Sequence, residues 1–419
     1  MTARVVTAAE VRGVRDERPA RLGGAHWSWL CFALFLPFTE PQMFKYSGLS
    51  FWDDVFAWLK AASALIIIVL YLRQRPSTAT TVVAALCFWL GLATVLTRTS
   101  IVTFLGPAVG LISTFMLFDI VSKHDFITFL KWIRNLLSLY YFLNLLSYII
   151  KETGMANIPI TFLGIDNRWI YYFLPWIVVS FIVAIYERGQ ATVGAWAVWL
   201  VCLLQLAAVW SAGAMVSILM WPLLWGCFMA KKTTGGFAIR RLGVIFIVVI
   251  ALNVLITADI ILPSLRWLIV DVLHKDITLA GRTYLWESVL RLLETKPMTG
   301  MGALANDSAI DFFYSSSGYV FACMVNHPHN NFLYYAFRGG FPAMILYGAL
   351  CYNAIRSIDK NRDLPYARCL AAGLSCFFLA ALIDTMDFSL MHMIFAISCN
   401  VSCLPVCSST PLKRIYSNI

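Results

Sequence analysis

The chain has 419 residues, of which 60% are hydrophobic and only 13% are charged, and its mean hydropathy is +0.76. This composition lies far outside that of soluble domains and indicates a protein with many membrane-spanning segments. The net charge of +10 would suggest nucleic acid in a soluble protein. In a membrane protein it must first be compared with the positions of the apolar segments, and we expect no nucleic-acid partner.

Residues 1–26 are polar and rich in arginine, and no small-residue cleavage site follows the apolar run that begins at Trp27. This pattern indicates a retained first helix. A helix needs about 20 apolar residues to cross a bilayer, and runs of this kind recur along the chain. The predicted spans are 27–38, 54–72, 80–97, 101–121, 130–150, 169–187, 191–210, 212–230, 242–262, 331–351, 369–384 and 388–407. The predicted fold class is therefore all-α, a polytopic transmembrane bundle of about 12 helices with one large, partly helical outer loop.

Basic residues gather in alternate gaps between these spans, as the positive-inside rule expects if the N-terminal tail is cytoplasmic. The opposite gaps, including the long stretch 263–330, then lie outside the cytoplasmic membrane. The predicted organisation is a cytoplasmic tail (1–26), membrane helices (27–262), an outer-facing loop (263–330), membrane helices (331–407) and a second cytoplasmic tail (408–419).

The loop 263–330 carries many titratable groups, which are costly in hydrocarbon, so we expect it to hold the chemistry of the protein. Within it, residues 283–294 predict an amphipathic helix suited to the membrane interface. Its apolar side consists of Leu285, Val289, Leu292 and Leu293.

Three motifs lie in and next to this loop. Gly281-Arg282-Thr283-Tyr284-Leu285-Trp286 opens the amphipathic helix, Pro297-x-x-Gly300-x-Gly302 follows it, and His329-Asn330 heads the next span with Gly340 eleven positions after the histidine. Together the motifs resemble the O-antigen ligase and polymerase family of membrane glycosyltransferases. The motifs cover about 281–343, and the topology of a dozen helices with one large outer loop agrees over the whole chain.

The resemblance implies a GT-C-like enzyme in the bacterial cytoplasmic (inner) membrane, with its active site on the outer face. Such an enzyme moves a glycan from an undecaprenyl-diphosphate carrier to an acceptor hydroxyl, with no nucleotide sugar, cofactor or required metal. The implied partners are the lipid-linked donor, a glycan or lipid acceptor, membrane lipids and a chain-length regulator.

A polymerase of O-antigen, capsule or exopolysaccharide is favoured over a ligase that acts on a lipid core or a protein, because residues 38–60 resemble those of surface-polysaccharide polymerases. A lipid-glycan transporter or flippase is the alternative of another class. The few charges inside the predicted spans and the lack of a two-fold repeat speak against it.

The chemistry suggests which residues act. When a sugar leaves a lipid diphosphate, negative charge builds up on phosphate oxygens and must be met by a metal or by fixed cations. No carboxylate pair of the DxD type occurs outside the predicted spans, so guanidinium groups are the expected counter-charge. Arg282 is the first candidate, and Arg168 and Arg98 follow, although snorkelling at a helix start is an alternative explanation for Arg168.

The sequence departs from the family at two places. Relatives often have a Ser-Arg pair at the start of the helix that here begins Ser211-Ala212-Gly213, so Arg168 or Arg98 would have to replace the missing arginine, or the diphosphate site is built differently. Ala343 stands where relatives usually have Gly, Thr or Tyr.

An acceptor hydroxyl needs a base that is neutral near pH 7, and imidazole is such a group. His329 is therefore the predicted base, with Asn330 and His327 as further contacts of the substrate. The structural alternative is that both histidines cap the following helix at the level of the lipid headgroups.

Overall fold

The computed structural model describes residues 24–46, 49–150, 160–229, 235–258, 260–261, 263–272, 274, 276–319, 322 and 325–405. Within these ranges the protein is helical, and the only β-type pairing is an isolated bridge between Thr161 and Gly164. The predicted fold class is confirmed. Both predicted cytoplasmic tails lie wholly or largely outside the described residues.

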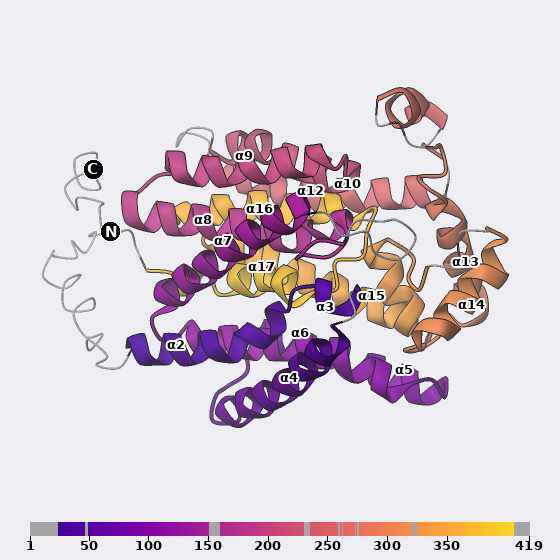
Figure 1. The fold of residues 1–419 in the computed structure, drawn as a ribbon, viewed down its shortest axis with the longest axis horizontal. Helices are drawn as coiled ribbons and strands as arrows, with labels where there is room; N and C mark the ends of the chain where they lie inside the picture. The colour runs from indigo at the N-terminus through magenta and orange to yellow at the C-terminus, as the bar shows by residue number, and fades with distance from the viewer. Residues whose placement is uncertain are drawn as a thin grey trace, which may run out of the picture.

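Each predicted span coincides with helical structure (Figure 1). Among the described residues, five helical segments are long and apolar enough to cross a membrane, and five shorter apolar helices accompany them. The first half of the chain forms α2 (Gly24–Phe35), η1 (Leu36–Thr39), α3 (Met43–Tyr46), α4 (Ser50–Tyr71), α5 (Thr78–Leu96), α6 (Ile101–Val121), α7 (Phe126–Ile150), η3 (Asp166–Arg168), α8 (Ile170–Arg188) and α9 (Val193–Ala208).

The second half contains the loop and the last membrane helices. It forms α10 (Ala212–Leu219), α11 (Trp221–Met229), α12 (Gly235–Thr257), η5 (Pro263–Leu265), η6 (Trp267–Val272), α13 (Arg282–Thr295), α14 (Asn306–Ser317), α15 (Asn331–Lys360), α16 (Pro365–Ala381), α17 (Ser389–Cys399) and η8 (Val401–Cys403). The span predicted at 212–230 is thus two helices, which meet at Met220. Pro222 explains the interruption, because its nitrogen has no hydrogen to donate within a helix.

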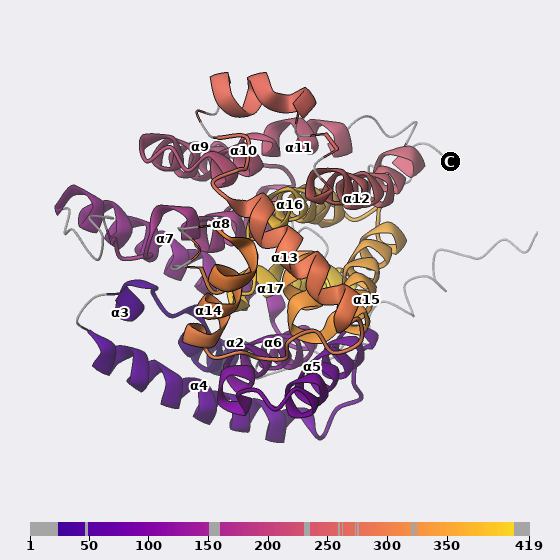
Figure 2. The same cartoon turned by 90° about the vertical axis from the view of Figure 1, so that its right-hand side faces the viewer.

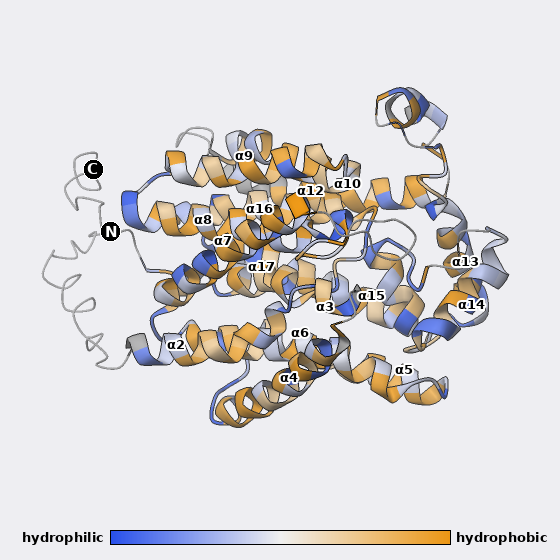
Figure 3. Cartoon of the chain, viewed as in Figure 1, coloured by the Kyte–Doolittle hydropathy of each residue, from blue (hydrophilic) through white to orange (hydrophobic). Residues whose placement is uncertain are grey.

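Helix α8 is the central helix of the bundle. Every residue from Ile170 to Ile185 is buried, as expected for a helix that is apolar on all sides. It packs against α7, α9, α16 and α17, and the hydropathy colours of Figure 3 show apolar residues along most of the surrounding helices. The N-terminal end of α8 is preceded by η3, which therefore has a fixed position at one end of the bundle.

Helices α13 and α14 lie at that same end, and Figure 2 shows them in front of the ends of the membrane helices. The predicted amphipathic helix is confirmed as α13, with Leu285, Val289, Leu292 and Leu293 buried. The predicted membrane-interface position of its apolar side is wrong, however. That side packs on α14 and α15 in a cluster with Phe313, so protein covers it in place of lipid.

Helix α15 breaks at Gly339–Gly340, and the loop of the second motif docks into the break. The Phe341 N–H donates to the Pro297 carbonyl at 2.8 Å, and the Met301 N–H donates to the Phe337 carbonyl at 2.7 Å. Gly340 has a φ of 66°, and a Cβ on it would lie 2.3 Å from the Pro297 carbonyl oxygen. Only glycine fits such a close approach in the left-handed conformation, which gives this motif a structural reason.

Candidate functional site

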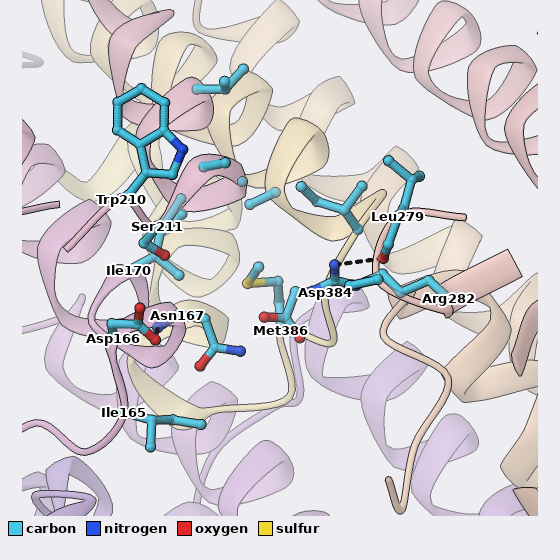
Figure 4. A pocket seen from close by; sticks show the side chains of 17 residues that line it. Ile165, Asp166, Asn167, Ile170, Trp210, Ser211, Leu279, Arg282, Asp384 and Met386 are labelled. Carbon is cyan, nitrogen blue, oxygen red and sulfur yellow. Dashed lines mark hydrogen bonds between the residues drawn. The ribbon is translucent and has the colours of Figure 1, made fainter. Parts of the chain in front are cut away.

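A cavity of about 460 Å³ opens between the start of α8, the start of α10, the start of α13 and the turn between α16 and α17. Figure 4 shows its labelled side chains, with Asp166 and Asn167 on one side and Arg282 on the other. The cavity draws its walls from four segments that are far apart in the sequence. It therefore exists only in the folded bundle.

Arg282 is the one cationic side chain among the described residues that line the cavity. It is the first residue of α13, and its Nη1 donates to the Leu279 carbonyl at 3.0 Å (Figure 4). Its Nε is buried and has no hydrogen-bond partner among the described residues. A partly buried guanidinium with a free donor is suited to an anionic ligand group such as a phosphate.

Asn167 also leaves a polar atom free at the cavity. Its side-chain oxygen is buried without a partner among the described residues, and Figure 4 shows the side chain pointing toward the cavity from η3. An amide oxygen accepts hydrogen bonds, as from sugar hydroxyls. The cavity thus combines a free cationic donor with a free neutral acceptor.

Asp384 lines the cavity and binds the predicted base. Its Oδ1 lies 3.1 Å from Nδ1 of His329, and the side chain of Asp384 is only 10% exposed. Burial alone would raise the pKa of Asp384, but the hydrogen bond from His329 and the charges of the two histidines and Arg282 hold that pKa well below its usual range. The carboxylate is therefore ionised and accepts the Nδ1 hydrogen, which leaves Nε2 of His329 as the basic nitrogen.

The backbone of His329 is unusual, with a φ of 48°. Histidine is one of the few residue types enriched in this left-handed region. Strained backbone of this kind persists where the surrounding structure fixes it, and it clusters at functional sites. Trp286 contributes to the fixing, because its Nε1 donates to the Pro328 carbonyl at 2.8 Å and so ties α13 to the histidine segment.

Comparison with known proteins identifies a family for part of the chain. Residues 176–348, from within α8 to within α15, match the family model described as O-antigen ligase. This stretch is an O-antigen ligase family domain. None of the curated proteins compared matches the chain.

The O-antigen ligase domain contains Arg282 and His329 but not the whole cavity. Asp166 and Asn167 come before the matched stretch, and Asp384 comes after it. The site is thus completed by segments outside the domain.

The other predicted site residues take different positions. His327 lies next to His329, with ring centroids 4.2 Å apart. Its Nδ1 accepts the backbone N–H of His329 at 3.3 Å. Burial, then the charge of His329, and further the charges of Arg168 and Arg282, lower the pKa of His327 well below its usual value against the opposing effect of Asp384. His327 is therefore a neutral neighbour of the base.

Asn330 is 1% exposed and caps α15, since its side-chain oxygen accepts the N–H groups of Phe332 and Leu333 at 3.1 Å. Its amide nitrogen donates to the Leu382 carbonyl at 3.2 Å. These bonds show that Asn330 caps α15 and positions the turn that carries Asp384. A contact of Asn330 with the substrate stays a prediction.

Arg168 and Arg98 differ in their relation to the cavity. Arg168 lies in η3 and donates from Nη1 to Oε1 of Gln42 at 3.0 Å. Its positive charge also contributes to the lowered pKa of His327. Arg98 is exposed in the turn between α5 and α6 and is not among the described residues that line the cavity. Of the two, Arg168 is nearer to the described site. A part for either in diphosphate binding stays a prediction.

The residues where the family's Ser-Arg pair is expected, Ser211 to Gly213, do line the cavity opposite Arg282. The helix therefore occupies the position that the resemblance implies, but without a cation. Arg282 alone supplies positive charge to the described cavity wall.

His327, His329 and Asp384 also form a set that could hold a metal ion, since one ligand atom from each lies within 4.8 Å of the other two. Two imidazoles and a carboxylate are a common ligand set for Zn²⁺ with an open fourth position. Independence of metal ions stays a prediction for this protein.

Sequence reasoning missed Asp384 as a site residue. In the sequence, Asp384 ends one predicted span and Asp387 directly precedes the next, so the two carboxylates mark only a short gap between apolar segments. The available signal was general: carboxylates at the edge of a membrane bundle are costly, and they usually have a partner or a function.

Proposed function

We propose that the protein is a membrane glycosyltransferase that transfers a glycan from a polyprenyl-diphosphate carrier to an acceptor hydroxyl, acting as a surface-polysaccharide polymerase. The observation that carries this proposal is that Asp384 lines the same cavity as Arg282 and also hydrogen-bonds His329, which is not itself among the described lining residues. A base with a fixed tautomer and a free guanidinium are the two groups that the reaction needs.

In the proposed mechanism, Nε2 of His329 takes the proton of the acceptor hydroxyl while the oxygen bonds to the anomeric carbon of the donor sugar. The bond between that carbon and the phosphate oxygen breaks, and the polyprenyl diphosphate leaves with the electron pair. Arg282 stabilises the negative charge that develops on the diphosphate. Asp384 stabilises the imidazolium that forms on His329, as the acid member of a triad does for its histidine.

No step of this mechanism requires a metal ion, and we propose a metal-independent reaction on the outer face of the bacterial inner membrane. EDTA should therefore leave activity in proteoliposomes intact. Zn²⁺ should inhibit, because a metal on the two histidines and Asp384 would occupy the base. Loss of activity in EDTA that Mg²⁺ or Mn²⁺ restores would overturn the metal-free mechanism.

The test of the function uses purified protein in proteoliposomes with undecaprenyl-diphosphate-linked repeat units as the only substrate. We expect longer lipid-linked chains to appear on gels, and none with His329→Asn. Asparagine tolerates the left-handed backbone of this position, so the variant removes the imidazole with little strain. His274→Asn is the matched control, because His274 also has a positive φ, 53°, and is exposed.

A ligase is the second candidate, because the matched family model is described as O-antigen ligase. It would use the same base and the same cation with a different acceptor. If repeat units alone give no longer chains, but addition of a lipid core or protein acceptor yields a glycosylated product, the ligase is the correct assignment. If His329→Asn retains wild-type turnover on every acceptor, neither transferase assignment holds.

A further inference from the structure

A second cavity lies at the other end of the bundle from Arg282. It has a volume of about 450 Å³ and is formed by α7, α8 and α9. Ile170, at the start of α8, lines the first cavity, and Arg188, at its end, lines the second. At about 1.5 Å per residue, α8 separates them by roughly the hydrocarbon thickness of a bilayer. The positive-inside pattern of the chain assigns this second end to the cytoplasmic leaflet.

The mouth of this groove is cationic. Arg134 and Arg188 line it, and Arg188 forms no hydrogen bond or ion pair with any described residue. The one carboxylate in the lining, Glu187, is paired with Lys131 at 2.8 Å. Lys131 is held further by the ring of Tyr186, 5.6 Å from its Nζ. Arg134 donates from Nε and Nη2 to Oδ1 of the adjacent, exposed Asn135 at 3.3 and 3.2 Å. Its Nη1 and the guanidinium of Arg188 therefore remain at the mouth for an external anion.

The deeper part of the groove is apolar with one free hydroxyl. Ala184, Ala195 and Val198 line it together with Ser180. Ser180 is 5% exposed, and its Oγ has no hydrogen-bond partner among the described residues. A buried hydroxyl without a partner is costly, and hydrocarbon tails offer it none.

We propose that this groove binds one anionic glycerophospholipid of the cytoplasmic leaflet. The phosphate lies between Arg134 and Arg188, an acyl chain covers the apolar wall, and an ester carbonyl of the lipid accepts the hydroxyl of Ser180. Basic pockets between membrane helices on the cytoplasmic side are suited to such headgroups. A free phosphate ion would satisfy the arginines but not the apolar wall, so the lipid fits the whole groove.

The test is native mass spectrometry of the full-length protein titrated with dioleoyl phosphatidylglycerol, with dioleoyl phosphatidylcholine as the zwitterionic reference. We expect one phosphatidylglycerol to bind at least five-fold more tightly than phosphatidylcholine. The double variant Arg134→Gln/Arg188→Gln should lose this preference. The charge-matched control Arg73→Gln/Arg75→Gln changes two exposed arginines in the gap between α4 and α5 and should keep it.

A third variant fills the groove without a change of charge. Gly194 lines the groove and is exposed, and a Cβ on it would meet nothing closer than the Thr192 hydroxyl at 3.7 Å. Gly194→Leu should therefore fold normally and lower phosphatidylglycerol binding at least five-fold. Unchanged lipid binding by this variant, or an equal loss in both arginine double variants, would overturn the proposal. Competition by millimolar inorganic phosphate that persists in Gly194→Leu would assign the arginines to a free anion instead.

Discussion

Replacement of Asp384 by asparagine tests the central pair of the proposed mechanism. The change keeps the size of the side chain and an oxygen for the backbone N–H of Thr385, which now bonds Oδ1 at 2.8 Å. It removes the charge that faces His329 at 3.1 Å. Two unit charges at that distance attract by about 5 kcal/mol at an effective dielectric constant of about 20.

The net stabilisation of the transition state is smaller than this attraction, because burial has already removed the water that hydrated the carboxylate. A hydrogen bond to a charged group contributes about 1.5–3 kcal/mol net, and about 1.4 kcal/mol corresponds to a tenfold change in rate. We therefore expect kcat for chain extension to fall by about 10-fold to 150-fold in Asp384→Asn, with a smaller change in KM. The assay is gel-resolved product formation in proteoliposomes at saturating lipid-linked donor.

The control is Asp311→Asn, which removes an exposed carboxylate of α14 and should stay within about twofold of wild type, as is usual for surface changes. A twofold or smaller loss in Asp384→Asn, with His329→Asn inactive, would refute the reasoning that Asp384 acts through the histidine.

Three further predictions concern other parts of the site and the fold. Arg282→Lys should lower kcat by about tenfold or more, measured with the same gels, because a point charge cannot replace a planar guanidinium on phosphate; an undiminished rate would exclude a diphosphate contact. The lowered pKa of His327 means that the unfolded chain gains a proton at this site below about pH 6.5 while the folded chain does not, so stability should fall as pH decreases from there. Melting curves of wild type between about pH 7.5 and 5 should show this loss, and His327→Gln should reduce it; identical slopes would contradict the prediction. Gly340→Ala should destabilise by about 3 kcal/mol or more, seen as loss of monodisperse protein, whereas Gly348→Ala, whose Cβ would meet nothing within 4 Å, should behave as wild type.

The helices of this protein were predictable because their signal is local. Runs of about 20 apolar residues gave the membrane segments, and the 3.6-residue periodicity gave α13 with its buried leucines. What periodicity could not give was the partner of the apolar side. Protein and lipid are equally apolar, so whether α13 rests on α15 or on the bilayer depends on tertiary structure.

The site residues also divide into those with a local sequence signal and those whose role depends on a tertiary contact. Arg282 and His329 were found because each stands in a motif whose chemistry can be read locally. Asp384 was missed because its part arises from a contact with a residue 55 positions away. The helix cap that Asn330 forms was also not foreseen, because its position beside a catalytic candidate drew attention only to a ligand contact.

The docking of residues 297–302 into the break of α15 has a consequence for how such proteins could be redesigned. Both ends of the segment that contains α14 are anchored, one by the bonds at Pro297 and Met301 and the other by the bond from Trp286 to Pro328. An exchanged or lengthened α14 that retains a large apolar side chain at Phe313 would alter what covers the end of the bundle without displacing either anchor. Transplanting this segment between relatives would therefore change the cover of the bundle end and leave the anchors in place.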